Sequence, residues 1–437
     1  MKKIFIIIFF LSVYNLFGQF KSDMPVSELE KNFHIKKNFR NIANYKSDTT
    51  INVNYYKLEL ALQTAPNLLT GKVTINSLVT VAAINSLFYD LSNVLTVDSI
   101  TSTAGATSFS HTNDKIQIAL PRSFIQNELT SITIYYHGLP DPTGFGSFEF
   151  GSHNNTPVIW TLSEPFGSSD WFPCKNVPDD KADSCDVWLT CAENFTAVSN
   201  GLLKEVTTNG NGTKTFKWHG SYPIANYLIS LAVTNYIQYD LYFKYSPTDS
   251  MPFNNFIYPE HFTTLKPQID KTIDMLSFYS SIYGFYPFIK EKYGHVEFGR
   301  LAGMEHQTIS SMGYWSDDII AHELTHQWFG DKITCKDWHH IWLNEGFATY
   351  GEALYEEHVR GKIGYEGFMQ AIMNNAKNAR GSIYVQDIES VEEIFDGTRT
   401  YAKGGTVLHM LRNIIGDSLY FTSVKRYAAD TTIAYKN

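Results

Sequence analysis

The sequence contains two histidines and two glutamates whose spacing suits a catalytic metal site. His322, Glu323 and His326 form the pattern H-E-x-x-H, and Glu345 follows after eighteen further residues. On a helix, residues i and i+4 lie on one face, so both imidazoles can point at one ion. Two histidines and one glutamate fill three corners of a zinc tetrahedron and leave the fourth for water. The spacing therefore predicts one zinc ion bound by His322, His326 and Glu345, with Glu323 as the general base.

Apolar neighbours of the motif favour a metal site over a chance occurrence of the pattern. A buried helix does not retain several polar groups without partners, and the apolar neighbours are Ile319, Ile320, Leu324, Trp328 and Phe329. The first helix is expected to run from its N-cap Ser316, with two aspartates in its first turn, to Gly330. A second helix is expected over residues 344–358, with Asn344 as its cap.

Glu352 lies seven residues after Glu345 and therefore on the same helical face. We expect it to orient a ligand histidine, with a solvated glutamate as the alternative. Three further histidines are out of register with the ligand set and are predicted to be structural or surface residues: His339, His340 and His358.

The residues around the motif resemble the zinc aminopeptidases of the aminopeptidase N type, a group of the gluzincins. The matching stretches are HELTHQWFG at residues 322–330 and WLNEGFA at residues 342–348. The resemblance covers roughly residues 50 to 437. It implies a thermolysin-like catalytic domain and peptide substrates with a free N-terminus.

The resemblance also implies residues that bind the substrate. Residues 302–306 read Ala-Gly-Met-Glu-His, where the family usually has Gly-Ala-Met-Glu-Asn or Gly-Gly-Met-Glu-Asn. Gly303, Met304 and Glu305 keep the register, and Glu305 is implied to be the main anchor of the substrate's α-ammonium. Ala302 and His306 depart from the usual pattern, and His306 could alter the substrate pocket.

Two further residues take family positions. Glu164, in the sequence Thr-Leu-Ser-Glu-Pro, is implied to reach the α-ammonium from the β domain, although Leu162 replaces the usual glutamine. Tyr401, in the sequence Thr-Tyr-Ala-Lys-Gly-Gly, is implied to stabilise the oxyanion. A free α-amine has a pKa near ~8 and is largely cationic at neutral pH, so two carboxylates would select chain ends. Two alternatives stay open: a thermolysin-type zinc endopeptidase and a non-catalytic secreted binding relative.

The pattern along the chain predicts an α+β multidomain protein. Residues 1–18 resemble a signal peptide, which predicts a secreted, periplasmic or cell-surface protein, and residues 19–48 form a lead-in segment. Residues 49–240 are expected to form an antiparallel β domain, because short β-branched and aromatic runs alternate with turn residues. Residues 241–437 are expected to form the mainly helical catalytic domain, shortened at its C-terminal end relative to the family. The expected strands are 53–62, 71–83, 86–91, 115–120 and 128–136.

Composition narrows the classes of partner. The 44 acidic residues outnumber the 35 lysines and arginines, and no basic stripe suggests a nucleic acid. No stretch of the mature chain is apolar enough to predict a membrane span. Four cysteines allow three complete disulfide pairings, and the sequence does not choose between them. Nothing in the sequence indicates an oligomeric state.

Overall fold

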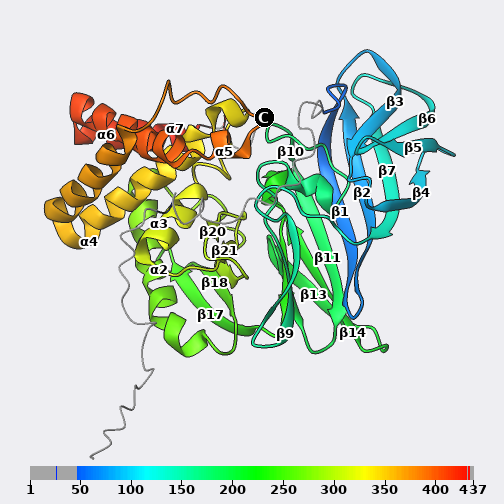
Figure 1. Ribbon diagram of the computed structural model, residues 1–437, viewed down its shortest axis with the longest axis horizontal. Helices are drawn as coiled ribbons and strands as arrows, with labels where there is room; N and C mark the ends of the chain where they lie inside the picture. Colours follow the sequence, from blue (N-terminus) through cyan, green and yellow to red (C-terminus); the bar gives the residue numbers. More distant parts are fainter. Residues whose placement is uncertain (1–25, 27–46, 431, 434–437) are drawn as a thin grey trace, which may run out of the picture.

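A large β part and a mainly helical part lie side by side in the computed structural model (Figure 1). The structure describes residue 26, residues 47–430 and residues 432–433. The predicted signal peptide and most of the lead-in segment therefore lie outside the described residues. Among the helices of the described residues, none is long and apolar enough to cross a bilayer.

A seven-stranded sheet dominates the β part. Side chains along its central strand β1 alternate between buried and partly exposed, as expected for a strand with one face on the core. The strands, in spatial order, are β13 (Leu202–Thr208), β14 (Thr213–Gly220), β11 (Ser184–Ala192), β1 (Ile51–Thr64), β2 (Asn67–Val79), β7 (Leu129–Gly138) and β4 (Thr96–Ser102).

One pairing in this sheet departs from the antiparallel prediction. Strands β1 and β11 are parallel, with Tyr55 opposite Ser184, whereas the other pairs of the sheet are antiparallel. The connection between β1 and β11 is long enough to return the chain in the same direction, which a hairpin cannot do. The predicted α+β class with a β-rich first domain is confirmed, and each of the five predicted strands overlaps an observed one.

Smaller sheets complete the β part and carry the loops that reach the site. A three-stranded sheet has the order β3 (Ala83–Asp90), β6 (Lys115–Ile125) and β5 (Ser108–Thr112). A four-stranded sheet has the order β12 (Thr196–Ser199), β16 (Leu231–Thr234), β9 (Thr156–Thr161) and β8 (Phe148–His153). The short strands β10 (Lys181–Ala182) and β15 (Ile224–Ala225) pair with each other. Two 3₁₀ helices lie in the loops, η2 (Gly167–Asp170) and η3 (Asn226–Leu228).

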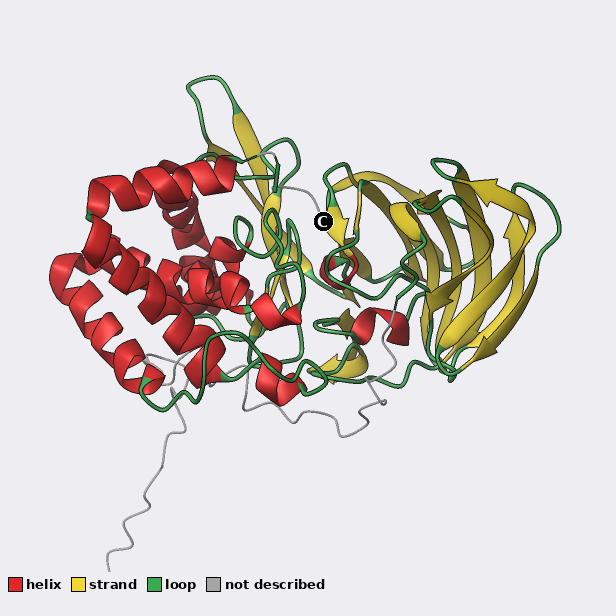
Figure 2. Ribbon diagram, turned by 90° about the horizontal axis from the view of Figure 1, so that it is seen from above, coloured by secondary structure: helices red, strands yellow, loops and turns green. Residues whose placement is uncertain are grey.

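The second part combines a mixed sheet with a group of helices, which Figure 2 shows gathered at one end of the molecule. The sheet has the order β17 (Ile237–Lys244), β18 (Ser250–Ile257), β19 (Tyr293–Glu297), β21 (Ser310–Met312) and β20 (Gly303–Met304). The α-helices are α2 (Phe262–Tyr283), α3 (Asp317–His326), α4 (Trp342–Ala376), α5 (Val391–Ile394), α6 (Gly404–Ile415) and α7 (Asp417–Ala429). A 3₁₀ helix, η4 (Trp338–His340), precedes α4, and a π-helix, η5 (Gly397–Lys403), precedes α6. The limits of the two domains stay predictions.

The predicted start of the first metal helix is confirmed, but its predicted end is wrong. The hydroxyl of Ser316 accepts a hydrogen bond from Ile319 N at 3.3 Å, as an N-cap does. Helix α3 ends at His326, four residues before Gly330. Gly330 has φ +139° and donates its N–H to Ile333 O at 2.8 Å, so the chain turns back on itself there.

The predicted cap of the second helix is also wrong. Helix α4 begins at Trp342, and Asn344 lies inside its first turn. The Asn344 side chain instead accepts a hydrogen bond from Cys335 N at 3.1 Å, which fixes the preceding loop. The helix extends to Ala376, with a non-helical residue at Gly361, well beyond the predicted 344–358.

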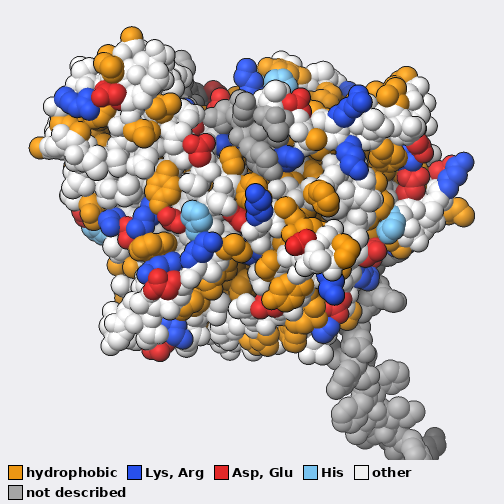
Figure 3. Space-filling model, turned by 180° about the vertical axis from the view of Figure 1, so that it is seen from behind, with side chains coloured by type: hydrophobic (Ala, Val, Ile, Leu, Met, Phe, Trp, Pro, Cys, Tyr) orange, Lys and Arg blue, Asp and Glu red, His pale blue; other side chains and the backbone are white. Residues whose placement is uncertain are grey.

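Two apolar cores underlie the two parts. One core lies mainly under the β sheets, and the other joins α2, α3, α4, α6 and α7 to the second sheet. All four cysteines are buried and free, so none of the three pairings forms. On the face shown in Figure 3, basic and acidic side chains are interspersed, so the excess of acidic residues is not gathered into one patch there.

Candidate active site

Helices α3 and α4 bring the three predicted metal ligands together. His322 and His326 lie on α3, and Glu345 lies in the first turn of α4. Oε2 of Glu345 lies 3.2 Å from Nε2 of His322 and 3.4 Å from Nε2 of His326. All three side chains are buried, and one ligand atom from each lies within 4.8 Å of the others.

The orientation of the two imidazoles fits a zinc ion. Nδ1 of His322 lies 2.7 Å from Glu352 Oε1, and Nδ1 of His326 lies 3.1 Å from the carbonyl oxygen of Phe329. Both Nε2 atoms are thereby directed towards Glu345. Metal-binding histidines usually hold their second nitrogen in this way, and the N,N,O donor set is that of a catalytic zinc site.

Two of the three ligands have the charge states that bind a metal ion. Burial opposes ionisation of Glu345, but His326 and His322 outweigh it and hold its pKa at about 2. Burial lowers the pKa of His322 to about 4, against the opposing effect of Glu345. Glu345 is therefore an anion and His322 a neutral imidazole at neutral pH, which are the forms that bind a metal ion. Burial opposes the charged form of His326, but the carboxylates of Glu305 and Glu345 outweigh it and raise its pKa, so this imidazole has to lose its proton when a metal ion binds.

Glu323 lies beside the ligand set on α3, against the strand that carries Gly303. The side chain of Glu323 is buried. A Cβ atom on Gly303 would collide with the Glu323 carboxylate and would lie 2.6 Å from its Cγ. A glycine at position 303 therefore leaves room for the Glu323 side chain. This steric reason is separate from the substrate-binding role that the family resemblance implies for Gly303.

The predicted amine anchors come from different parts of the chain and meet at the metal set. Glu164 follows β9 in the β domain, whereas Glu305 follows β20. Oxygen atoms of Glu164, Glu305 and Glu345 lie within 4.8 Å of one another, and all three side chains are buried. Burial raises the pKa of Glu305 to about 7, an effect that His326 opposes and Glu345 reinforces. Each carboxylate is thus placed where a cation would relieve its burial.

Tyr401 lies on the π-helix η5, and its ring centroid is 6.0 Å from that of His322. A contact between glycines places it there, because a Cβ on Gly346 would lie 2.9 Å from Gly404 Cα. Gly346 directly follows Glu345, so this close approach sets Tyr401 beside the metal ligands. Single π-helical turns are frequent at functional sites.

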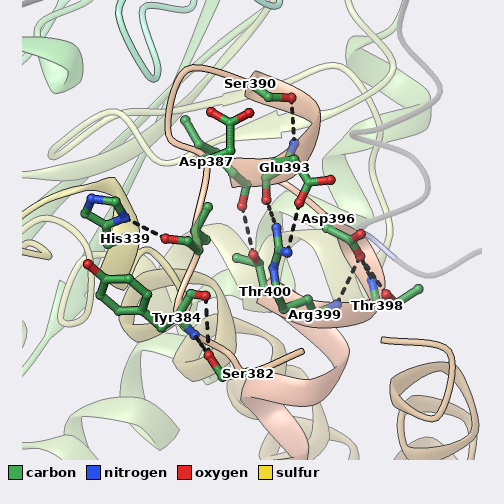
Figure 4. A network of polar contacts seen from close by, with 12 residues as sticks. His339, Ser382, Tyr384, Asp387, Ser390, Glu393, Asp396, Thr398, Arg399 and Thr400 are labelled. Carbon is green, nitrogen blue, oxygen red and sulfur yellow. Dashed lines mark hydrogen bonds and ion pairs between the residues drawn. The ribbon is translucent and has the colours of Figure 1, made fainter. Parts of the chain in front are cut away.

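A polar network fixes the loop that leads into Tyr401 (Figure 4). The carboxylate of Asp396 accepts from Thr398 N at 2.8 Å and from Arg399 N at 3.1 Å, which caps the π-helix. Arg399 pairs with Glu393 at 2.9 Å, and Thr400 Oγ1 donates to Ile394 O at 2.8 Å. These contacts fix the backbone between Glu393 and Thr400, directly before Tyr401.

Comparison with known proteins identifies the architecture that holds this site. Residues 52–228 match the Peptidase M1 N-terminal domain, and residues 295–437 match the Peptidase family M1 domain. The chain belongs to the M1 peptidase family.

Relatives of this M1 peptidase include aminopeptidase N of Haemonchus contortus, 26% identical over 353 residues, which cover 72% of this chain and 35% of the relative. Aminopeptidase N of Lactobacillus delbrueckii subsp. lactis is 35% identical over 117 residues, which cover 25% of this chain and 14% of the relative. The chain thus spans about a third or less of the length of these curated relatives.

Solved structures of an M1 zinc metallopeptidase from Deinococcus radiodurans share the fold over nearly the whole chain. One matches with a TM-score of 0.78 at 24% identity and covers 89% of this chain and 88% of that one. A glutamate-to-alanine mutant of that metallopeptidase matches with a TM-score of 0.77 at 25% identity and 89% coverage of both chains.

The pocket of this M1 peptidase has walls that sequence reasoning missed. Phe145 from the β domain and Phe395 from the loop before η5 both line it, with their rings edge-to-face at 5.2 Å. Arg300 is a third residue that lines the pocket and was not predicted from the sequence. Isolated residues in a chain with 30 phenylalanines carry no periodic signal, so only the tertiary fold reveals them. Predicted site residues that also line the pocket are Glu164, Gly303, Met304, Glu305, His326, Glu345 and Tyr401. Leu162 and Ala302, which depart from the usual family pattern, line it as well.

The remaining histidines of the M1 peptidase lie in other contacts. His306, at the position of the usual asparagine, is buried, and its Nδ1 lies 2.8 Å from Ser311 Oγ. Three histidines were predicted to be structural or surface residues. His339 contacts Val385 O, His340 contacts Asp337, and His358 contacts Asp274.

Proposed function

We propose that this chain is a zinc-dependent aminopeptidase that removes the N-terminal residue of peptides. The observation that carries the proposal is the meeting of Glu164 and Glu305 with the metal ligand Glu345 inside one buried pocket. Hydrolysis alone needs the metal ligands and Glu323. Two further buried carboxylates, supplied by two domains, need a cation in the substrate.

The α-ammonium of a peptide chain is that cation. It has a pKa near ~8 and carries its charge at neutral pH. Pairing it with Glu164 and Glu305 would offset the cost of burying both carboxylates and would set which peptide bond lies at the metal site. An internal peptide segment has no such charge, so the pocket favours chain ends over internal bonds.

The residues of the chain divide the chemistry of hydrolysis. A zinc ion held by His322, His326 and Glu345 would polarise the scissile carbonyl and make water a nucleophile at neutral pH. Glu323 takes a proton from the attacking water and delivers it to the leaving amine. The Tyr401 hydroxyl donates a hydrogen bond to the oxyanion that develops on the carbonyl oxygen.

Hydrolysis of aminoacyl-arylamides tests the proposal. We expect the purified protein to release the arylamine, to contain about one zinc ion per chain and to lose activity with a chelator. N-acetylation of the substrate should abolish turnover, because it removes the charge that Glu164 and Glu305 bind. Continued cleavage of acetylated peptides would support the endopeptidase alternative instead.

A second comparison separates a catalyst from a binding relative. We expect Glu323→Gln to keep its zinc and to lower kcat by roughly two to four orders of magnitude, the usual contribution of a general base. The matched control is Glu366→Gln on the exposed part of α4, which should leave kcat unchanged. Normal turnover by the zinc-loaded Glu323→Gln protein would contradict the mechanism.

We also propose short peptides as substrates and export as the route to them. The Deinococcus radiodurans metallopeptidase has been solved with a Tyr-Ser-Ala substrate bound, and the basic and then apolar residues 1–18 have the order of a signal peptide. Expression with the native N-terminus followed by N-terminal sequencing of the mature protein should give a first residue at or near Gln19. Recovery of a protein retained in the cytoplasm would contradict export, whereas an exported protein that still begins at Met1 would contradict cleavage of the signal peptide.

A further inference from the structure

The turn that follows the amine anchor contains a strained residue. Thr308 has φ +69°, in the left-handed region that a β-branched residue rarely adopts. It lies three residues after Glu305, between β20 and β21. A conformation of this kind persists only where surrounding contacts hold it, and such residues gather at functional sites. The contacts around Thr308 therefore indicate what the turn is built to fix.

The side chain of Gln327 spans this turn from the metal side. Its Oε1 accepts a hydrogen bond from Thr308 N at 2.9 Å, and its Nε2 donates to Glu305 O at 3.2 Å. Gln327 is buried and directly follows the metal ligand His326. The amide group of Gln327 therefore joins both ends of the turn from Glu305 to Thr308 to the end of the metal-binding helix α3.

The β domain and Lys292 hold the turn from the other side. Asn200 Nδ2 donates to Gln307 O at 2.7 Å, and Gly201 N donates to Thr308 Oγ1 at 2.9 Å. Lys292 Nζ lies 3.3 Å from Thr308 Oγ1 and 3.2 Å from the carbonyl oxygen of Ser199. The backbone of the turn is thus fixed against both domains.

The carboxylate of Glu305 depends on that backbone. Among the described residues, Oε1 of Glu305 has no hydrogen-bond partner. Within the described residues no hydrogen bond to that oxygen holds it in place, so the backbone position of Glu305 is one determinant of where the carboxylate lies. We propose that Gln327 is a positioning residue, which holds Glu305 at the distance from the metal-binding histidines that a substrate's α-ammonium requires. This inference rests on the proposed aminopeptidase function.

A purely structural role for Gln327 predicts a different result. A buried amide that only satisfies backbone groups would affect stability and the amount of folded protein. A positioning residue would, in addition, change how much the enzyme gains from the α-amine of its ligand. The two roles are separated by comparing ligands that differ only in that amine.

The experiment uses leucine hydroxamate and its analogue without the amine, 4-methylpentanoyl hydroxamate, as binding probes. Calorimetry gives the ratio of their Kd values for the zinc-loaded wild type and for Gln327→Glu and Gln327→Met. Gln327→Glu keeps an acceptor for Thr308 N but loses the donor to Glu305 O, whereas Gln327→Met loses both. We expect the preference for the free amine to fall about tenfold or more in both variants. The Kd of the amine-free probe should change less than about twofold.

Hydrogen exchange supplies a readout that needs no zinc. The Thr308 amide should exchange faster in Gln327→Met, because its acceptor is gone, and should stay protected in Gln327→Glu. The control is Tyr136→Phe, which removes a buried hydrogen bond in the core of the β part, from the Tyr136 hydroxyl to Trp171 O at 2.6 Å. This control should lower stability without changing the Kd ratio.

Three outcomes would count against the inference. A wild type that binds both hydroxamates equally would overturn the aminopeptidase proposal and the positioning role with it. A wild type that prefers the amine, with a ratio unchanged in both folded, zinc-loaded variants, would overturn the positioning role alone. Equal loss of the ratio in Tyr136→Phe would also overturn it, because a general loosening of the core would then explain the effect.

Discussion

Nδ1 of His322 lies 2.7 Å from the carboxylate of Glu352, seven residues beyond Glu345 on α4. The two carboxylates on one face of α4 therefore do different work: Glu345 faces both Nε2 atoms, and Glu352 holds the ring of His322 from behind. This contact fixes the tautomer of His322 that offers Nε2 to a metal ion.

Glu352→Gln should weaken zinc binding by about 10- to 100-fold, the usual cost of removing a partner behind a metal-binding histidine. Competition with a chromophoric chelator measures this change. The control is Glu366→Gln, which lies farther along α4 and is exposed. Equal zinc affinity in Glu352→Gln and wild type would show that the contact does not support the metal site.

Gly303→Ala should displace Glu323 from its place beside the metal set, because the added methyl group meets the Glu323 side chain. A shift of about 1 Å in a reacting group can lower the rate on the order of 100-fold, so kcat should fall strongly while zinc content stays at the wild-type value. Steady-state kinetics with metal analysis checks this expectation.

A matched glycine controls for the substitution itself. Gly367 lies in α4 with no atom within 4 Å of its would-be Cβ, so Gly367→Ala should leave kcat unchanged. It should also stabilise the helix by roughly 0.5–1 kcal/mol. Full activity in Gly303→Ala would mean that the loop between β19 and β21 relaxes without moving Glu323.

Tyr401→Phe should lower kcat by roughly 100- to 1,000-fold, the usual cost of one oxyanion donor, with KM little changed. The phenyl ring keeps the packing of the π-helix, so the melting temperature should stay close to that of wild type. Tyr384→Phe is the control, because Tyr384 stacks on His339 in the preceding loop and does not line the pocket. A large change in KM alone would place Tyr401 in substrate binding.

Lys181 gives a pH dependence of stability. Burial lowers the pKa of its ammonium group to about 7, whereas the unfolded chain has the ordinary value of 10.5. Between these values the unfolded state binds more protons than the folded state, so the free energy of unfolding rises with pH. The Lys181 contribution should rise by about 1.4 kcal/mol per pH unit between pH 7 and pH 10.5 and stay constant outside that range.

Urea denaturation at pH 7.5 and pH 9 measures this dependence in wild type and in Lys181→Met. The methionine variant lacks the titrating group, so the difference in unfolding free energy between the two proteins should shift in favour of wild type as the pH rises. A difference that is the same at both pH values would show that Lys181 remains charged in the folded protein.

Local sequence rules were sufficient to predict that the candidate metal ligands lie together. The i, i+4 relation of His322 and His326 and the equal phase of Glu345 and Glu352 are properties of a helix, so the structure places these side chains together as the spacing implied. The Ser316 cap follows in the same way, because its hydrogen bond spans only three residues.

Features that depend on distant segments were beyond those rules. Asn344 has the residue type of a helix cap, but its side chain accepts a hydrogen bond from Cys335 N instead. Phe145 and Phe395 are separated by most of the chain and meet only after the two domains pack. The role of Gln327 is likewise invisible in sequence, since it depends on the backbone of Glu305 and Thr308.

The division of the site between two domains bears on how such a protein can diverge. The histidines and Glu323 lie on one short helix, whereas Glu164 follows strand β9 of the β domain. Mutations in that domain can therefore change the position of Glu164 while the metal-binding helix stays intact. Under the proposed aminopeptidase function, substrate preference can change through the β domain while the metal ligands stay the same, and we expect paralogues of this chain to differ most in that domain.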